Sequence, residues 1–380
     1  MGVFFKIFFI QTIVTAYVFW RGWQILPNRK WVHTSYTSIF ASQFLIYLFG
    51  FFAYTHLSQD VMYPIACLGT SWAVMMTAMA IALAGYDVLY FLDRKQKLLS
   101  SKIDLSSKKL KTYYFTLALT CIISIMGYGY YKFRHPVVTE LNIQIDKKAG
   151  NVAKMRIAVI SDLHLGTIIN KEIFGMYVDK IMEQHPDMIL MVGDQIDYHL
   201  QPVTEQRMEE EFSRLKAPYG VYMVAGNHDY IEIEREGEDA KIKWLDQLPD
   251  IMLLRDSALL VSDAFYIVGR EDERIDHRKP LDVIMAEVDR NMLVIILNHQ
   301  PHNLKEDADS GADIALYGHT HNGQLFPYNL FINMIYEVGY GYKKKGNTHI
   351  YVTSGLGLSG PQYRIGTSSE ILMLNVNFSE

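Results

Sequence analysis

The sequence has little cysteine, and its N-terminal part has almost no acidic residues. Only Cys67 and Cys121 occur in 380 residues, and both lie in apolar runs, which excludes a disulfide scaffold and a cysteine-based zinc site. Residues 1–131 contain no Glu and only four Asp against 11 Lys and Arg. Residues 132–380 carry 37 acidic and 25 basic residues, a net charge of −12, which is unsuited to binding a nucleic-acid backbone.

Long stretches without charge predict that residues 1–131 form four transmembrane helices. Three stretches are free of Asp, Glu, Lys and Arg, namely 34–59, 61–86 and 112–131. Each reaches the roughly 20 residues that span a hydrocarbon core. The first stretch, 7–20, is shorter and could be a signal peptide, but no small-residue cleavage site follows it, which favours a retained helix.

The connecting segments predict the orientation in the membrane. Segment 93–111 carries seven Lys and Arg, the first loop carries Arg29 and Lys30, and the second loop carries none. By the positive-inside rule, the first and third loops face the cytoplasm, and everything after the fourth helix faces outward. Asp87, close to the Lys-rich segment, is expected to lie at the membrane interface.

Residues 132–380 alternate short apolar strands with helices, which is typical of an α/β domain with helices covering a sheet. The expected strands are 141–145, 155–161, 188–192, 221–225, 293–297 and 314–317. The expected helices are 171–184, 205–216 and 281–290. The domains are therefore expected to be a transmembrane region (1–131), a linker with the first strand (132–154) and a catalytic domain (155–380).

Five of these strands end in Asp, His or Asn, where ligands gather in open α/β sheets. These residues are Asp162 and His164, Asp194 and Asp197, Asn227 and His228, His299, and His319 with His321. Residues two apart in an extended chain project to the same side, which pairs Asp162 with His164 and His319 with His321. Mixed imidazole and carboxylate ligands suit zinc, iron or manganese. Glycines before Asp194, Asn227 and His319 permit sharp turns and close approach.

The five blocks and their order resemble the calcineurin-like metallophosphoesterase superfamily. The blocks are D-x-H, G-D-x-x-D, G-N-H-D, a lone His and G-H-x-H. The segments His319–Gln324 and Tyr351–Gly357, with Arg364 and Glu370, are similar to membrane-anchored bacterial phosphodiesterases of that superfamily. The resemblance covers roughly residues 140–376. It implies a β-sandwich flanked by helices and a bacterial origin, and it does not cover the four-helix transmembrane region that precedes the sandwich. Together with the predicted orientation, the expected location is a bacterial plasma membrane with the catalytic domain extracytoplasmic.

The resemblance also implies roles for the residues that match the blocks. Asp162, His164 and His321 would hold one divalent metal ion, and Asn227, His299 and His319 a second, with Asp194 bridging both. His228 would face the substrate, and Asp197 would either orient His228 or cap a loop. Asp229 is expected to support or cap the site, and Arg364 to contact the substrate anion or brace the C-terminal strands. Manganese, zinc or iron would serve, and a metal-bridging hydroxide would attack in line.

The function expected is hydrolysis of phosphodiester or phosphomonoester bonds, with the lipid bilayer and a phosphate ester, possibly lipid-linked, as partners and no nucleic acid. The apolar stretch 325–342, followed by Lys343, Lys344 and Lys345, is either a lipid-facing wall of the site or a covering loop. Three alternatives stay open. They are a UDP-sugar-lipid pyrophosphatase, a non-catalytic receptor or scaffold on the same fold, and a transporter or sensor regulated by the outer domain.

Overall fold

The chain divides into two compact units, one formed by residues 1–129 with 360–362 and the other by 130–359 with 363–380. The computed structural model describes residues 2–52, 57–99, 103–147, 149–150, 152–231 and 240–379. The two units are considered separately below.

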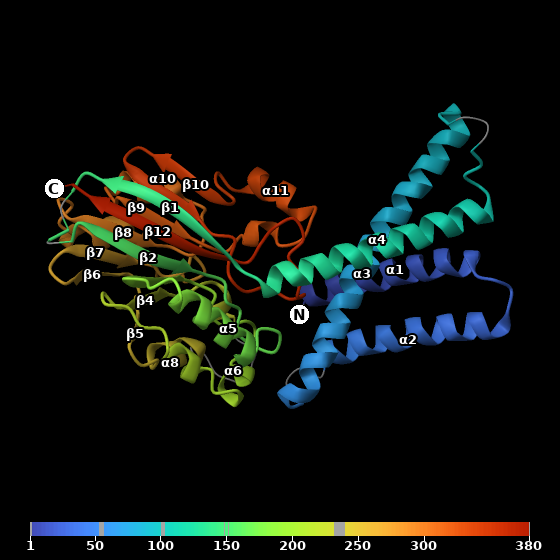
Figure 1. Ribbon diagram of the computed structural model, residues 1–380, viewed down its shortest axis with the longest axis horizontal. Coiled ribbons are helices and arrows are strands. Elements are labelled where there is room, and N and C mark those ends of the chain that lie inside the picture. Colours follow the sequence, from blue (N-terminus) through green and yellow to red (C-terminus); the bar gives the residue numbers. More distant parts are fainter. Residues whose placement is uncertain are drawn as a thin grey trace. The chain divides into compact units, whose positions relative to one another are not determined.

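Four helices make up the first unit, the last of them ending in the second (Figure 1). They are α1 (Gly2–Ile25), α2 (Lys30–Phe52), α3 (Gln59–Gln96) and α4 (Lys108–Arg134). Within the described residues, α3 and α4 are long and apolar enough to cross a membrane, judged by length and composition. The presence of apolar N-terminal helices agrees with the sequence, whereas the number of four spans stays a prediction.

Asp87 is paired inside the first unit. Its carboxylate lies 2.8 Å from the Arg21 guanidinium of α1 and accepts a hydrogen bond from the Tyr17 hydroxyl at 2.6 Å. The third helix continues to Gln96, past the charge-free stretch 61–86. The ion pair with Arg21 stabilises the carboxylate of Asp87 in this apolar helix.

The second unit is a sandwich of two six-stranded sheets, which confirms the α/β fold class (Figure 1). The first sheet has the order β1 (Val137–Ile145), β12 (Glu370–Phe378), β2 (Lys154–Ile160), β3 (Met188–Val192), β4 (Val221–Val224) and β5 (Ile251–Leu253). The second has the order β10 (Gly341–Lys345), β11 (Thr348–Val352), β9 (Ile314–Tyr317), β8 (Leu293–Leu297), β7 (Phe265–Gly269) and β6 (Ser257–Val261). Strands β2 to β5 run parallel to one another, as do β7, β8 and β9.

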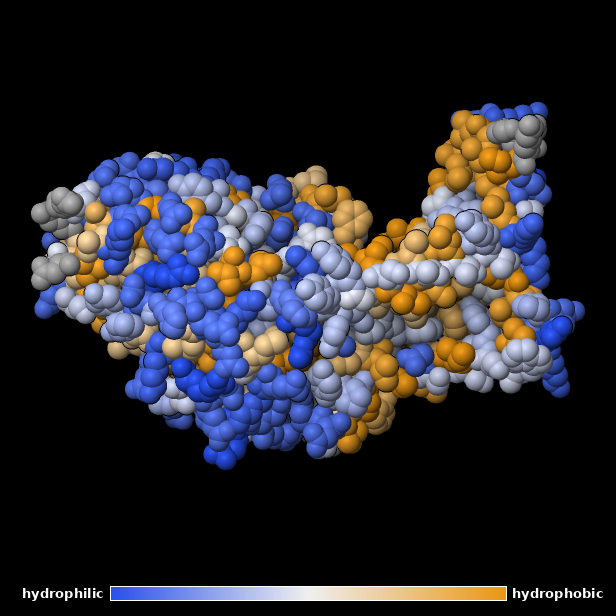
Figure 2. All heavy atoms as spheres, viewed as in Figure 1, coloured by the Kyte–Doolittle hydropathy of each residue, from blue (hydrophilic) through white to orange (hydrophobic). Residues whose placement is uncertain are grey.

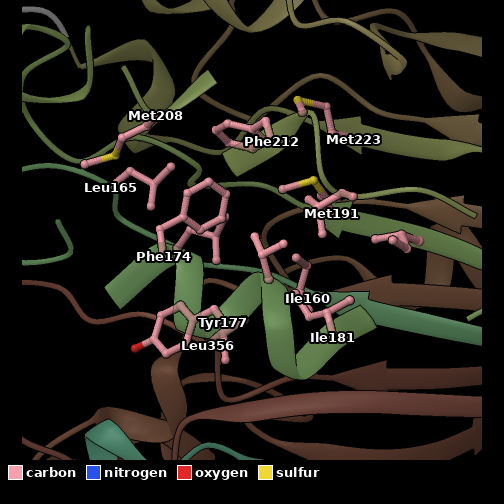
Figure 3. Close-up of a cluster of buried hydrophobic side chains, with 14 of the residues drawn as sticks. Ile160, Leu165, Phe174, Tyr177, Ile181, Met191, Met208, Phe212, Met223 and Leu356 are labelled. Atoms are coloured by element: carbon pink, nitrogen blue, oxygen red, sulfur yellow. The ribbon is translucent and has the colours of Figure 1, made fainter. Parts of the chain in front are cut away.

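Helices cover the outer faces of both sheets, and apolar side chains fill the space between the sheets. On the first sheet, Phe174, Tyr177 and Ile181 of α5 (Lys171–Met182) pack against Ile160 and Met191 of the strands below (Figure 3). Spacing of three and four residues puts these side chains on one helix face. The second sheet is covered by α9 (Leu281–Ile284) and α10 (Leu304–Asp309).

Two predicted helices are shorter than expected. Of the stretch 205–216, only Glu209–Phe212 forms a helix of its own (α7), and α6 (Gln201–Glu205) ends where the stretch begins. Between them Arg207 has φ of +53°, a left-handed conformation that ends an α-helix. The stretch 281–290 forms α9 followed by one 3-10 turn at Met285–Glu287, and then turns away.

Candidate metal centre

The structure brings the residues predicted from the five blocks to one edge of the sandwich. Strands β2, β3 and β4 of one sheet and β8 and β9 of the other each end in one of the blocks. Three groups of His and Asp side chains converge there among the described residues. Asp162, His164 and His321 form the first group, and Asp194, His299 and His319 form the second. His164, Asp194 and His228 form a third group that shares one member with each of the other two.

The first group places two imidazole nitrogens face to face. Nε2 of His164 lies 3.0 Å from Nε2 of His321, and the latter lies 3.4 Å from Oδ1 of Asp162. Burial, with His164 and Arg364 nearby, holds the pKa of His321 well below its usual range, so this ring is neutral. Its free electron pair, a second imidazole and a carboxylate converge on one point, which is the donor set of a divalent cation.

The second group contains a histidine whose orientation is fixed. Nδ1 of His299 donates to the carbonyl oxygen of Val192 at 2.8 Å, which turns Nε2 toward Asp194, 3.2 Å away. Burial opposes protonation, but the Asp194 carboxylate outweighs it and raises the pKa of His299 to about 10. A cation that binds at Nε2 must therefore displace a proton. Oδ1 of Asn227 is buried without a hydrogen-bond partner among the described residues, as an unoccupied ligand atom would be.

Asp194 lies between the two groups. Its Oδ2 is 3.2 Å from Nε2 of His299 and 3.6 Å from Nε2 of His164, while Oδ1 accepts the backbone N–H of His228 at 2.8 Å. Burial alone would favour the neutral acid, but the surrounding imidazoles hold the pKa of Asp194 well below its usual range. An ionised carboxylate that faces both groups fits a ligand shared by two cations.

Asp197 contacts two imidazoles. Its Oδ1 lies 3.3 Å from Nδ1 of His228 and 3.4 Å from Nδ1 of His164. Burial raises its pKa, but His164 and His228 outweigh that effect and lower it to about 2, so the carboxylate is charged. The geometry favours the orienting role expected for Asp197 over a loop cap. His228 itself is half-buried, with its ring edge against Tyr198 at 5.0 Å.

The backbone conformation at these positions differs from the expectation. Asp162, His164, Asp194, His319 and His321 all have positive φ, between +48° and +70°. The argument that extended chain brings Asp162 beside His164 is therefore wrong, although both side chains do reach one group. His319 and His321 point into different groups. Left-handed conformations in non-glycine residues cost energy and gather at functional sites, where the surrounding structure enforces them.

Two glycines are required for close approach at the centre. A Cβ at Gly226 would overlap the backbone nitrogen and Oδ1 of Asp194. A Cβ at Gly318 would overlap Oγ of Ser161 and come within 2.5 Å of Oδ2 of Asp162. Any side chain at either position would push a carboxylate away from its group, as expected from the glycines in the blocks.

The expectation that Arg364 contacts a substrate anion is wrong. Its side chain is fully buried and donates hydrogen bonds to four backbone carbonyls. They belong to His321, Ser354, Gly355 and Gly357, at 2.6 to 3.0 Å. Arg364 thus braces the loops beneath the centre, which is the second role considered for it.

Two further charged residues position the loops. Asp229 is buried and accepts backbone N–H groups from Gln195, Ile196 and Gly226 at 2.9 to 3.2 Å, in agreement with the supporting role expected for it. Lys241 is buried too, and its Nζ donates to the carbonyls of Asp197 and His228. Sequence reasoning missed Lys241, because a lone lysine in an ordinary helical pattern carries no signal of burial.

Comparison with known proteins agrees with this site. Residues 155–323 match the family model described as calcineurin-like phosphoesterase. An uncharacterized metallophosphoesterase of Helicobacter pylori strain J99 is 28% identical over 285 residues, covering 72% of this chain and 74% of the relative. A transmembrane protein with metallophosphoesterase domain from Danio rerio is 27% identical over 353 residues, covering 84% and 77%. The uncharacterized metallophosphoesterase YkoQ of Bacillus subtilis is 29% identical over 275 residues, covering 68% and 98%.

These matches confirm the resemblance drawn from the five blocks. We assign residues 155–323 to the calcineurin-like metallophosphoesterase superfamily.

Proposed function

We propose that this chain is a membrane-anchored phosphoesterase that works with two divalent cations. The observation that carries the proposal is the position of Asp194, whose Oδ2 faces both histidine groups at 3.2 and 3.6 Å. A site for one cation does not need a carboxylate that faces two groups of ligands. In a site for two cations, one carboxylate can bind both.

The proposal gives each residue a role. Asp162, His164 and His321 would hold one cation, Asn227, His299 and His319 the other, and Asp194 would contact both. The imidazole and carboxylate donors favour manganese, zinc or iron over calcium or magnesium. When bound, the two cations would supply positive charge for a phosphate group and lower the pKa of water.

His228 would protonate the leaving group of the substrate. It lies beside the first group without being required as a ligand, and Asp197 holds its Nδ1 side at 3.3 Å. Because Asp197 contacts Nδ1, Nε2 is the ring nitrogen that would face a bound phosphate ester. A histidine in this position can donate a proton to the departing oxygen.

The test of the function is metal-dependent cleavage by the full-length protein in detergent micelles. Bis-p-nitrophenyl phosphate and p-nitrophenyl phosphate report diester and monoester cleavage. We expect cleavage with manganese, loss with excess chelator, and recovery when manganese, zinc or iron is returned, because both groups need cations to bind phosphate. Cleavage that survives chelation contradicts the proposal. No cleavage of either ester with two cations bound, counted by elemental analysis, would favour the non-catalytic receptor or scaffold.

We further propose that residues 132–380 lie outside the cytoplasm. The support is the seven Lys and Arg of segment 93–111 and the absence of Lys and Arg in the second loop. A reporter enzyme that is active only in the cytoplasm, fused after Glu380, should be inactive, whereas the same reporter inserted in the loop 103–107 should be active. The opposite pattern would reverse the topology and place residues 132–380 in the cytoplasm.

A further inference from the structure

Helix α11 (Tyr328–Ile335) exposes most of its apolar side chains, whereas a surface helix of a soluble domain turns them toward the core. All eight of its residues are exposed or half-buried, and Met334 and Ile335 are 80% and 69% exposed. From residue 137 onward, twelve large apolar side chains are exposed in the described part of the chain, and eight of them lie between Phe326 and Tyr342. Apolar surface is therefore concentrated at α11 (Figures 1 and 2).

The inner side of α11 is held by close packing on glycines. A Cβ at Gly323 would overlap the backbone of Asn329, and a Cβ at Gly339 would overlap the side chain of Ile332. Asn329 and Ile332 are half-buried, while the apolar residues around them point outward. The exposure of these apolar side chains is thus set by a helix that is fixed against the domain.

The apolar surface leads directly to the candidate metal centre. Tyr336 follows the last residue of α11, and its ring stacks on His302 at 5.2 Å with an interplanar angle of 13°. Both rings lie 6.2 Å from the ring of His319. His302 is exposed and adjoins a proposed ligand. One layer of side chains therefore separates the centre from the apolar helix.

Charge and connectivity favour a bilayer as the occupant of this surface. Residues 325–345 carry Lys343, Lys344, Lys345 and one acidic residue, a net charge of +2 within a region whose net charge is −12. A basic edge beside apolar side chains matches anionic lipid head groups above acyl chains. Only two residues separate the end of α4 at Arg134 from the start of β1 at Val137, so no long spacer follows α4.

We infer that α11, with Phe326, lies in the interface of the bilayer and that the substrate is the phosphate ester of a membrane lipid. The helix would bring the lipid head group beside Tyr336 and His302, within reach of the metal centre. The substrate class rests on the proposed function, whereas the insertion of α11 does not.

Insertion is tested on the full-length protein in vesicles of phosphatidylcholine and phosphatidylglycerol. Met334→Cys, in a Cys67→Ser/Cys121→Ser background, carries the fluorophore NBD, and some lipids carry a doxyl quencher. The control is Val283→Cys, which is 58% exposed on α9. We expect blue-shifted emission and about twofold quenching at position 334 and neither at 283. Equal behaviour at the two positions overturns the inference, as does cross-linking of position 334 between copies without quenching.

The substrate class is tested by the double variant Met334→Ser/Ile335→Ser, with Val283→Ser as control. We expect cleavage of a long-chain lipid phosphate in vesicles to fall about tenfold, with cleavage of the soluble nitrophenyl esters unchanged. An equal fall for soluble and lipid esters overturns the lipid assignment. A protein that quenches at position 334 but cleaves no ester, with cations bound, contradicts the proposed function and leaves the insertion of α11 standing.

Discussion

Asp194→Asn is expected to lower kcat/KM at least about 10³-fold, a loss as large as that of a general acid or base, because it removes the shared negative charge. The amide is nearly isosteric, but its NH₂ group would repel one of the two cations that the carboxylate is proposed to hold. Elemental analysis should therefore find fewer than two cations per chain. The nitrophenyl ester assay measures kcat/KM in the full-length protein.

Asp250→Asn is the matched control for this change. Asp250 is exposed and has φ of +61°, close to the +54° of Asp194, so the same substitution is made in the same backbone conformation. We expect Asp250→Asn to keep full activity and both cations.

His228→Ala should keep both cations and still lose about 10²- to 10⁴-fold in turnover. An Asp194→Asn variant with two cations and ordinary turnover would exclude the proposed bridging role.

Arg364→Met is expected to destabilise the second unit by about 3–5 kcal/mol. Methionine fills a similar volume, but it leaves four buried carbonyls without the guanidinium that binds them. The backbone of residues 356 and 357 also donates to the carbonyls of Ser161 and Asp162, so the loop of the first group should lose its position as well. Thermal unfolding in detergent should show a Tm lower by about 10 °C.

Arg274→Met serves as the control, since Arg274 is exposed, and should leave Tm unchanged. Arg364→Lys should be intermediate, because an ammonium group has three donors and cannot reach four carbonyls in one plane. Excess manganese should restore little of the loss, since the bracing lies beneath the metal ligands. A Tm for Arg364→Met equal to that of the unaltered protein would show that the buried guanidinium does not support the fold.

The sequence predicted the elements that carry the blocks better than the rest of the domain. Strands β3, β8 and β9 match their predicted bounds, because each is a continuous apolar run followed directly by Gly or Asn. Strands β5, β6 and β7 escaped prediction: none of them runs into one of the five blocks, and β5 and β7 pair with strands that lie elsewhere along the chain. The only sign of β12 in the sequence was the similarity to known phosphodiesterases around Glu370.

The composition of the candidate site was predictable, but its geometry was not. Residue types at strand ends pointed to Asp162, Asp194 and His299 without any structure. The positive φ values at Asp162 and Asp194 depend on tertiary contacts that force a strained backbone, so a rule based on extended chain could not give them. The burial of Arg364 was equally hidden, because the carbonyls it binds lie in loops that meet only after folding.

The order of strands in the first sheet has a consequence for biosynthesis. β12, the last strand of the chain, lies between β1 and β2 and pairs with both, so that Val137 adjoins Glu370. Neither early strand can complete its backbone hydrogen bonds until the final residues have left the ribosome. The sheet therefore stays incomplete throughout synthesis, and a chain that stops before residue 370 leaves β1 without a partner strand and β2 paired with β3 alone.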